Sequence, residues 1–238
     1  MAGVIFAATV VRTTLGFGEA LVAVPLLALR LPLAVAAPLA VIVSIVVASL
    51  VIARDWRHVE VRSAAWLTGT SLIGIPLGIY VLTHASDHVA KAVLGVIIAG
   101  FGIYAARGMS SPRLADDDLG WLCTAGFVAG VLGGAYGMNG PPLAIYGTLR
   151  GWSPHRFRAT LQGYFLVASI VGVIGYATQG LINEQLGQYL LLAVPSIAAG
   201  VAVGHAIANR LRAAHFLGAV NVGLVLIGVV LLLEGLLG

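Results

Sequence analysis

Long apolar runs separated by short polar segments make up most of the chain. Six such runs each extend for about 20 residues, the length that an α-helix needs to cross a hydrocarbon core of about 30 Å. The sequence therefore predicts an all-α, polytopic membrane protein. The six spans are expected at about 33–53, 64–83, 89–107, 157–178, 187–207 and 213–235.

A further apolar run, residues 2–29, is too long for a simple span. Its 28 positions would make a single helix of about 42 Å. The segment Gly16-Phe17-Gly18-Glu19, here called the first break, interrupts this run, and its two glycines favour a turn. We expect two short helices, 2–15 and 19–30, that meet at the first break.

The run at residues 121–149 is interrupted in the same way, at 134–140. Its second break reads Tyr136-Gly137-Met138-Asn139-Gly140-Pro141-Pro142. Proline is favoured at the first position of a helix, and Asn139 or Gly140 before it is typical of an N-cap. We expect one helix to end near Ala135 and another to begin at Pro141.

The two breaks are candidates for a binding site. A helix N-terminus presents unpaired N–H groups and a partial charge of roughly +0.5, which together suit an anion. Within a membrane, non-helical backbone is tolerated only where it is buried in protein or lines a wet cavity. The sequence therefore predicts that a small anion binds where the two breaks meet.

The second half of the chain repeats the pattern of the first. At an offset of 121 positions the first break falls on the second, and Phe6 falls on Phe127. We predict one integral membrane domain made of two repeats, residues 1–107 and 121–238, joined by a linker at 108–120. Each repeat is a broken-helix hairpin followed by three transmembrane helices. At an offset of 126, three glycine pairs coincide, namely Gly74 with Gly200, Gly78 with Gly204 and Gly102 with Gly228.

The positions of arginine and lysine decide between two topologies. If each long run crossed the membrane once, the basic residues outside the first hairpin would divide five against seven between the two faces. If each long run enters and leaves on the same face, they divide ten against two, with Arg12 inside the first hairpin. Only the second arrangement obeys the positive-inside rule. It inverts the two repeats relative to each other and predicts a multi-pass protein of the cell inner (plasma) membrane with both termini outside the cytoplasm.

Composition excludes several classes of protein. Hydrophobic residues make up 60% of the chain and charged residues 9%, with a mean hydropathy of +1.02, whereas a soluble domain carries about 25% charge. The net charge of +4 does not indicate nucleic acid, because the basic residues lie in short loops between apolar runs. The single cysteine, Cys123, and the scattered histidines form no ligand motif. We expect no metal, no cofactor and, from the uncharged N-terminal residues, no removable signal peptide.

Three blocks of sequence resemble a known family. They are residues 15–27, which begin Leu15-Gly16-Phe17-Gly18-Glu19, residues 125–142, and Arg158-Ala159-Thr160. They are similar to signatures of the TauE/SafE sulfite exporter family, which are transporters of the 4-toluene sulfonate uptake permease type. The resemblance implies an inverted-repeat transporter of sulfite, sulfonates, other sulfur oxyanions or organic acids. This chain has Glu19-Ala20 at positions where many members have further glycines. The resemblance therefore does not identify which substrate this chain carries.

Arg12 and Glu19 are the charged residues closest to the first break. A charge at membrane depth costs about 3 kcal/mol or more, so such a residue is usually functional. The Arg12 guanidinium could bind a carboxylate, sulfonate or sulfite oxygen. It could equally snorkel to the surface or form a structural pair with Glu19. Glu19 could take up a proton and couple transport to the proton gradient, or it could serve only as the counter-ion of Arg12.

Other polar residues near the breaks are candidates for weaker reasons. Arg158 and Gln162 are one helical turn apart, so they share a face that could point at Pro141, although Arg158 could also be a positive-inside anchor. Asn139 could donate to a bound oxygen or only cap a helix, and nearby hydroxyls could bond their own backbone. The candidate substrate-binding residues are Arg12, Thr13, Gly16, Phe17, Gly18, Glu19, Tyr136, Gly137, Met138, Asn139, Gly140, Pro141, Arg158 and Gln162.

The hypothesis that the sequence favours is a secondary transporter that moves a small anion by alternating access. No P-loop motif indicates the use of ATP within this chain. One alternative is an intramembrane enzyme acting on a lipid phosphate, although Glu19 is the only acid at a break and such chemistry needs a nucleophile or metal carboxylates. The other alternative is an anion channel. Besides the anion and the lipid bilayer, a second copy of the chain in a homo-oligomer is an open possibility.

Overall fold

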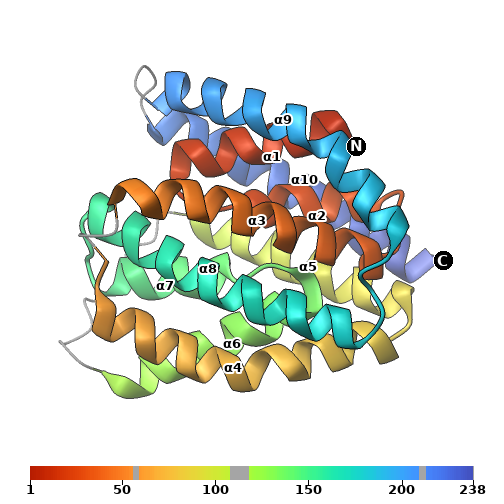
Figure 1. The fold of residues 1–238 in the computed structure, drawn as a ribbon, viewed down its shortest axis with the longest axis horizontal. Helices are drawn as coiled ribbons and strands as arrows, with labels where there is room; N and C mark the ends of the chain where they lie inside the picture. The colour runs from red at the N-terminus through yellow and green to blue at the C-terminus, as the bar shows by residue number, and fades with distance from the viewer. Residues whose placement is uncertain (56–58, 108–117, 209–212, 238) are drawn as a thin grey trace.

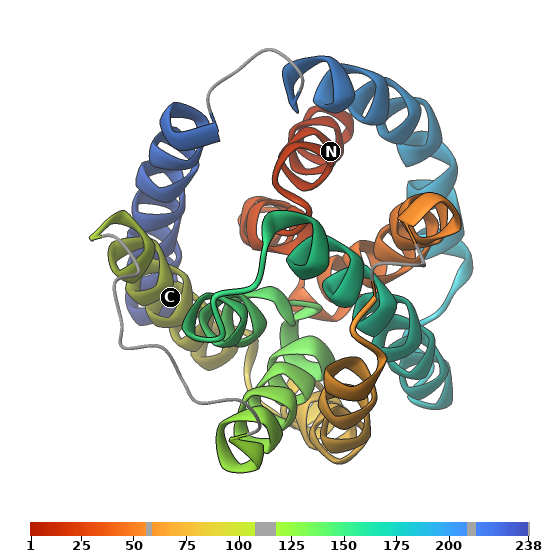
Figure 2. The same cartoon turned by 90° about the vertical axis from the view of Figure 1, so that its left-hand side faces the viewer.

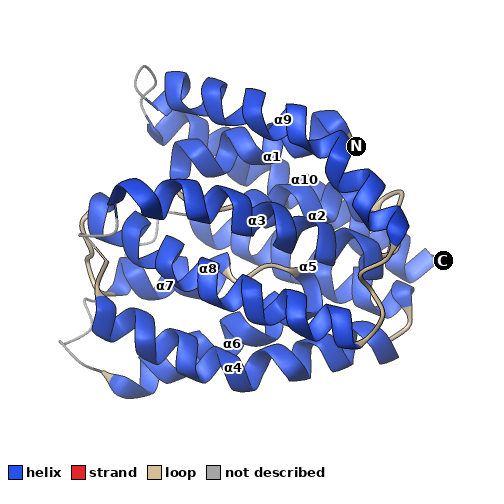
Figure 3. Cartoon of the chain, viewed as in Figure 1, coloured by secondary structure: helices blue, strands red, loops and turns tan. Residues whose placement is uncertain are grey.

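The computed structural model describes residues 1–55, 59–107, 118–208 and 213–237, and the regular elements in these ranges are all α-helices (Figure 3). Residues 108–117 of the expected linker lie outside the described ranges, as do Arg57, Arg113, Arg210 and Arg212. The helices are α1 (Ala2–Leu15), α2 (Glu19–Ala28), α3 (Leu33–Asp55), α4 (Val61–His84), α5 (Asp87–Ala106), α6 (Leu119–Tyr136), α7 (Gly140–Leu149), α8 (Pro154–Thr178), α9 (Glu184–Ala208) and α10 (Ala213–Leu237).

The two expected helix breaks are confirmed. Helix α1 ends at Leu15 because Gly16 adopts a left-handed conformation with φ 85°, and α6 ends at Tyr136 because Gly137 does the same with φ 67°. A left-handed glycine is a common helix stop, since it turns the backbone away without a clash with a Cβ. Gly18, with φ 95°, then leads directly into α2. Each long apolar run is thus a pair of shorter helices.

The helices lie roughly side by side along the longest axis of the molecule (Figure 1). Within the described ranges, five of them are long and apolar enough to cross a membrane, namely α4, α5, α6, most of α8 and most of α9. The arrangement confirms the expected polytopic, all-α membrane protein. The shorter apolar segments are in α1, α2, α3 and α10.

Both chain termini lie at one end of the bundle, at the right in Figure 1. Helix α3 starts near that end and runs to the opposite end, where α4, α6, α8 and α10 begin (Figure 1). The run containing α1 and α2 therefore enters and leaves at the same end, and α1 packs against α2. The run containing α6 and α7 behaves likewise at the opposite end.

The first hairpin lies inside the bundle rather than at its rim (Figure 2). Helix α1 packs against α9 and α10, and α2 packs against α3, α5 and α10. Helices α5 and α10 pair along their length, and an ion pair of 3.1 Å between Lys91 and Glu234 joins them. A polar group on the first hairpin is therefore surrounded by protein instead of lipid.

Close helix pairs recur in the two halves. Helix α4 packs along α6, and α9 packs along α1. These approaches require glycine, because an added Cβ would overlap the facing helix. On α4 it would meet a backbone carbonyl oxygen of α6, and on α9 it would meet the Cβ of Thr9 or Thr13 and lie close to a backbone carbonyl oxygen of α1. Two of these contacts occupy matching positions in the two halves. In one matching pair, Gly78 contacts Val131 and Gly204 contacts Val10. In the other, Gly74 contacts Phe127 and Gly200 contacts Phe6.

Candidate functional site

The first break brings a cation and an anion together inside the protein. Arg12 lies in the last turn of α1 and Glu19 is the first residue of α2. Their side chains are only 4% and 2% exposed, and the distance from Nη1 of Arg12 to Oε2 of Glu19 is 2.7 Å. Breaking such a buried pair would leave a bare charge in an apolar setting, which is strongly unfavourable. Arg12 does not snorkel to the surface, and Glu19 is its counter-ion.

Two other helices also hold the Arg12 guanidinium. Nη1 donates to Oγ of Ser44 in α3 at 2.7 Å, and Nη2 donates to the Ser44 carbonyl at 3.3 Å. Nη2 also donates to Oε1 of Gln162 in α8 at 2.7 Å, and the ring of Phe165 lies 5.3 Å from the guanidinium carbon. Only Nε has no partner among the described residues. An incoming anion would have to displace one of these acceptors to reach Arg12.

Arg158 and Gln162 meet the first break rather than the expected Pro141. The Nε2 of Gln162 donates to the carbonyl oxygen of Gly16 at 2.6 Å. The stem of Arg158 lies so close to Gly16 that a Cβ there would be 2.5 Å from its Cγ. The two side chains do share a face of α8, but that face packs on the end of α1. Helix α8 therefore clamps the first hairpin.

Asn139 occupies the N-cap position of α7, as one of the two residues expected there, but its side chain makes no capping hydrogen bond. An N-cap side chain bonds the N–H of the second or third helical residue, and those positions are Pro141 and Pro142, which have no N–H. The Asn139 backbone is helical instead, and its Nδ2 donates to Oη of Tyr164 in α8 at 3.2 Å. That hydroxyl lies 2.7 Å from Oγ of Ser71 in α4.

The same prolines make the two breaks unequal as anion sites. The first turn of α7 loses two N–H donors to Pro141 and Pro142. The first turn of α2 contains no proline, and its earliest bond back to the break runs from the N–H of Val22 to the carbonyl of Gly18. The first three residues of α2 thus keep N–H groups without an intrahelical acceptor. The amide donors for an anion come mainly from the first break.

A small cavity of about 20 Å³ lies between the two breaks. This volume is enough for about one water molecule, so little free space remains beside the ion pair. The buried Oε1 of Glu19 has no hydrogen-bond partner among the described residues. The residues that line this cavity, here called the anion cavity, are Arg12, Gly18, Glu19, Ala20, Leu21, Ser44, Gly137, Met138, Asn139, Gly140 and Phe165.

The remaining candidates do not line this cavity; they are Thr13, Gly16, Phe17, Tyr136, Pro141, Arg158 and Gln162. Thr13 packs on Gly204 of α9, and Phe17 meets Phe157 edge-on with 5.8 Å between ring centroids. Tyr136 is buried at the end of α6. Sequence reasoning missed Ser44 and Phe165, which touch Arg12 from unbroken spans. Ser44, one of two serines in the apolar run at 33–53, was the one available signal.

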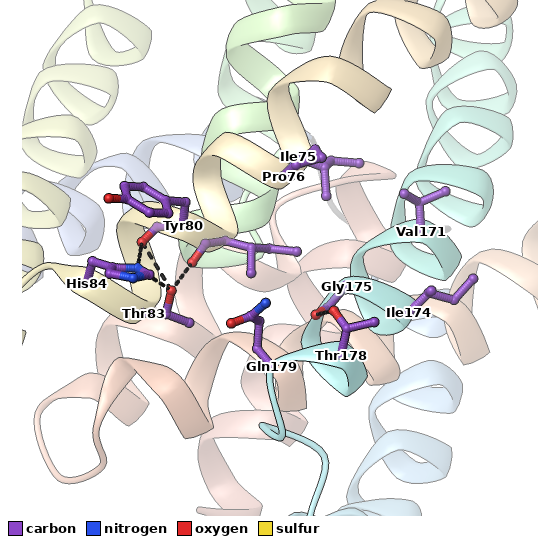
Figure 4. Close-up of a pocket in the computed structure, with 11 residues that line it drawn as sticks. Ile75, Pro76, Tyr80, Thr83, His84, Val171, Ile174, Gly175, Thr178 and Gln179 are labelled. Carbon is purple, nitrogen blue, oxygen red and sulfur yellow. Dashed lines mark hydrogen bonds between the residues drawn. The ribbon is translucent and has the colours of Figure 1, made fainter.

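The largest cavity described lies elsewhere, between the C-terminal ends of α4 and α8 (Figure 4). It measures about 400 Å³ and is mostly apolar, with polar groups at one rim. There, Nδ1 of His84 lies 2.9 Å from Oγ1 of Thr83, and its ring stacks on Tyr80 (Figure 4). None of the candidate residues lines it, and neither do lysine, arginine or an acid. The smaller cavity between the breaks, which several of the candidate residues do line, is therefore the candidate site.

The family model described as "Sulfite exporter TauE/SafE" matches residues 1–231. The chain belongs to this family. A curated TauE/SafE-type relative, the probable sulfite/organosulfonate exporter TauE of Cupriavidus necator, is 26% identical over 204 residues, covering 83% of this chain and 79% of that protein. The family is one of membrane exporters and not of enzymes, so the alternative of an intramembrane enzyme is set aside. No solved structure matches the chain.

Proposed function

We propose that this TauE/SafE family member is a secondary transporter that carries sulfite, a sulfonate or a related small anion across the inner membrane by alternating access. The observation that carries the proposal is the buried Arg12–Glu19 pair at the meeting point of the two breaks. The name of the Cupriavidus necator relative supports the same class of substrate. In this proposal the anion lies between the first turn of α2 and the second break.

The anion replaces the Glu19 carboxylate as a partner of Arg12. Both are oxygen acceptors, and a sulfonate or sulfite presents its oxygens at a spacing that suits the guanidinium fork. The free N–H groups at the start of α2 and the positive end of its dipole add further stabilisation of negative charge. Ser44 and Gln162 keep the guanidinium in place while its carboxylate partner leaves.

Charge balance then requires a proton. The Arg12–Glu19 pair is neutral, so adding a monoanion would leave one net negative charge in a buried site, which is costly. A proton on the released Glu19 carboxyl restores neutrality. The Glu19 Oε1, which has no partner among the described residues, is available to carry it. We infer that each monoanion moves together with one proton.

The two halves of the chain provide the moving parts. Matching glycine contacts of α4 on α6 and of α9 on α1 support two inverted repeats, residues 1–107 and 121–238, around the site. The end of the bundle where α4, α6, α8 and α10 begin is the cytoplasmic face by the positive-inside rule, and both termini lie outside. Alternating access must separate α8 from the first hairpin, because Gln162 bonds both Gly16 and Arg12.

Flux of ³⁵S-labelled sulfite in proteoliposomes tests the proposal. Arg12→Gln is expected to lower the initial rate by about tenfold or more, because the guanidinium interaction is worth about 1.5–3 kcal/mol. Arg30→Gln is the matched control, since Arg30 is exposed at the end of the first hairpin.

Arg12→Gln alone strands a buried carboxylate, so a second variant separates folding from binding. The double substitution Arg12→Gln with Glu19→Gln removes both charges and is expected to fold with a thermal transition close to that of the unmodified protein. It should still fail to bind sulfite. Full sulfite flux in this double variant would show that Arg12 is only structural and would overturn the proposal.

A further inference from the structure

We propose that the two entrances to the anion cavity are unequal, and that Arg158 binds the anion at one of them before it reaches Arg12. This entrance lies toward the end of the bundle where α8 begins, which the proposed topology makes cytoplasmic. The inference rests on the proposed transport function and goes beyond it, because it assigns a charged approach to the cytoplasmic side and an apolar approach to the outer side.

Each break is covered by a helix of the other half, at equivalent positions. A Cβ on Gly16 of the first break would lie 2.5 Å from Cγ of Arg158 in α8. A Cβ on Gly137 of the second break would lie 3.2 Å from the carbonyl oxygen of Ala37 in α3. The same offset of 121 positions separates the two glycines and the two residues that they contact. The two contacts are therefore counterparts in the two halves.

The two contacts lie toward opposite ends of the bundle. Helix α8 begins at the end away from the chain termini, and α3 begins near the termini (Figure 1). Arg158 and Ala37 are each in the second turn of their helix. Since the anion cavity lies between the two breaks, an anion that arrives from one end must part Gly16 from Arg158. An anion that arrives from the other end must part Gly137 from Ala37.

Only one of these entrances carries a charge at the contact. Arg158 is half-buried, and its Nε lies 3.2 Å from the place that a Cβ on Gly16 would take. This Nε is buried and has no hydrogen-bond partner among the described residues. A buried N–H of a cation without an acceptor is costly, so its position beside the first break points to an anion that bonds it. Ala37, its counterpart, is buried and apolar.

The neighbouring Arg156 shows what an ordinary surface arginine does on the same helix. Its side chain is 57% exposed and forms an ion pair of 3.5 Å with Glu60. Arg158 instead lies one turn before Gln162, the residue that holds Arg12. When α8 separates from the first hairpin, an anion on Arg158 is thus one helical turn from the group that bonds Arg12. A fixed positive charge there raises the local anion concentration and stabilises the loaded state that is open to the cytoplasm.

Initial uptake of ³⁵S-sulfite into inside-out and right-side-out membrane vesicles tests the inference, because the two preparations give a KM for each side. Arg158→Met removes the charge and keeps a stem that packs on Gly16. It is expected to raise the KM on the cytoplasmic side by about fivefold, the size expected for one partly solvated charge contact. The maximal rate should not fall, and the KM on the outer side should not change. Arg158→Lys keeps a positive charge on a similar stem and should stay within about twofold of the unmodified KM on both sides.

Arg156→Met is the matched control, since it removes an exposed arginine two positions away, and it should change neither KM. A rise of similar size in this control, or a rise in the outer KM of Arg158→Met, would overturn the inference while leaving the proposed function intact. Lower maximal rates from both sides in Arg158→Met and Arg158→Lys, with both KM values unchanged, would show that Arg158 only packs on Gly16 and would also overturn it. Absence of saturable sulfite uptake by the unmodified protein would overturn the proposed function as well.

Discussion

The side-chain amide of Gln162 donates to the carbonyl oxygen of Gly16 at 2.6 Å, across 146 positions of the chain. The last carbonyl groups of a helix lack intrahelical partners, and this bond supplies one to the end of α1. The same side chain accepts a hydrogen bond from Arg12. One residue of the second half thus holds both the backbone and the charge of the first break.

Gln162→Leu is expected to destabilise the folded protein by about 1–3 kcal/mol, because it leaves two buried polar groups without their partner. Thermal unfolding of the purified protein in detergent measures the effect. Gln179→Leu is the control, since Gln179 is exposed at the end of α8. Equal transition temperatures for the two variants would mean that Gln162 does not clamp the first break.

Gly16→Ala should be more harmful than Gly180→Ala. Both glycines adopt a positive φ, at 85° and 70°, so both substitutions carry a backbone cost of about 1–2 kcal/mol. A Cβ at Gly16 would also meet the stem of Arg158, whereas nothing lies within 4 Å of one at Gly180. The difference between the two unfolding free energies isolates this clash. Adding Arg158→Ala to Gly16→Ala should recover that difference, and a failure to recover it would contradict the described packing.

Gly78→Ala and Gly204→Ala should cost similar amounts of stability, about 1–3 kcal/mol each, because each forces a tightly packed helix pair apart. Gly78 lies on Val131 and Gly204 on Val10, at matching positions of the two halves. Gly69→Ala in α4, with open space around it, should be neutral or stabilising by up to about 1 kcal/mol. A large effect at only one of the two contacts would argue against equivalent halves.

Tyr164→Phe tests the network at the second break. The Tyr164 hydroxyl accepts from Asn139 and bonds Ser71, so its removal leaves buried groups unpaired at a cost of about 1–3 kcal/mol. Tyr80→Phe is the control, because Tyr80 is 59% exposed. Unfolding in detergent again provides the measurement, and an effect no larger than that of the control would show that this network contributes nothing to stability.

Much of the architecture follows from local sequence. Gly16, Gly18 and Gly137 interrupt apolar runs that are too long to cross once, and each adopts the left-handed conformation that glycine permits. The positions of the arginines along the sequence favoured the hairpin topology over a single crossing of each long run. The helix breaks and the hairpin topology depend on the conformations of neighbouring residues and on the length of each apolar run relative to the membrane. Both can be read from a single sequence.

The environment of Arg12 could not be predicted in the same way. Glu19 is seven positions away and was anticipated, but Gln162 is 150 positions away and Ser44 is one of two serines in a long apolar span. Which face of α3 and α8 turns toward Arg12 is set by packing of the whole bundle. Asn139 takes the N-cap position that the sequence predicted, but Pro141 and Pro142, which signalled the helix start, also removed the N–H groups that its side chain would bind.

The central claim, that an anion replaces Glu19 on Arg12 and that Glu19 then takes up a proton, is tested most directly by counting protons during binding. Methanesulfonate is the probe, because it stays ionised at any pH at which the protein is folded. Titration calorimetry in buffers of different ionisation enthalpy should give an uptake of about one proton per anion for the unmodified protein and about none for Glu19→Gln. Binding of methanesulfonate without proton uptake, or the same uptake in both proteins, would contradict the claim.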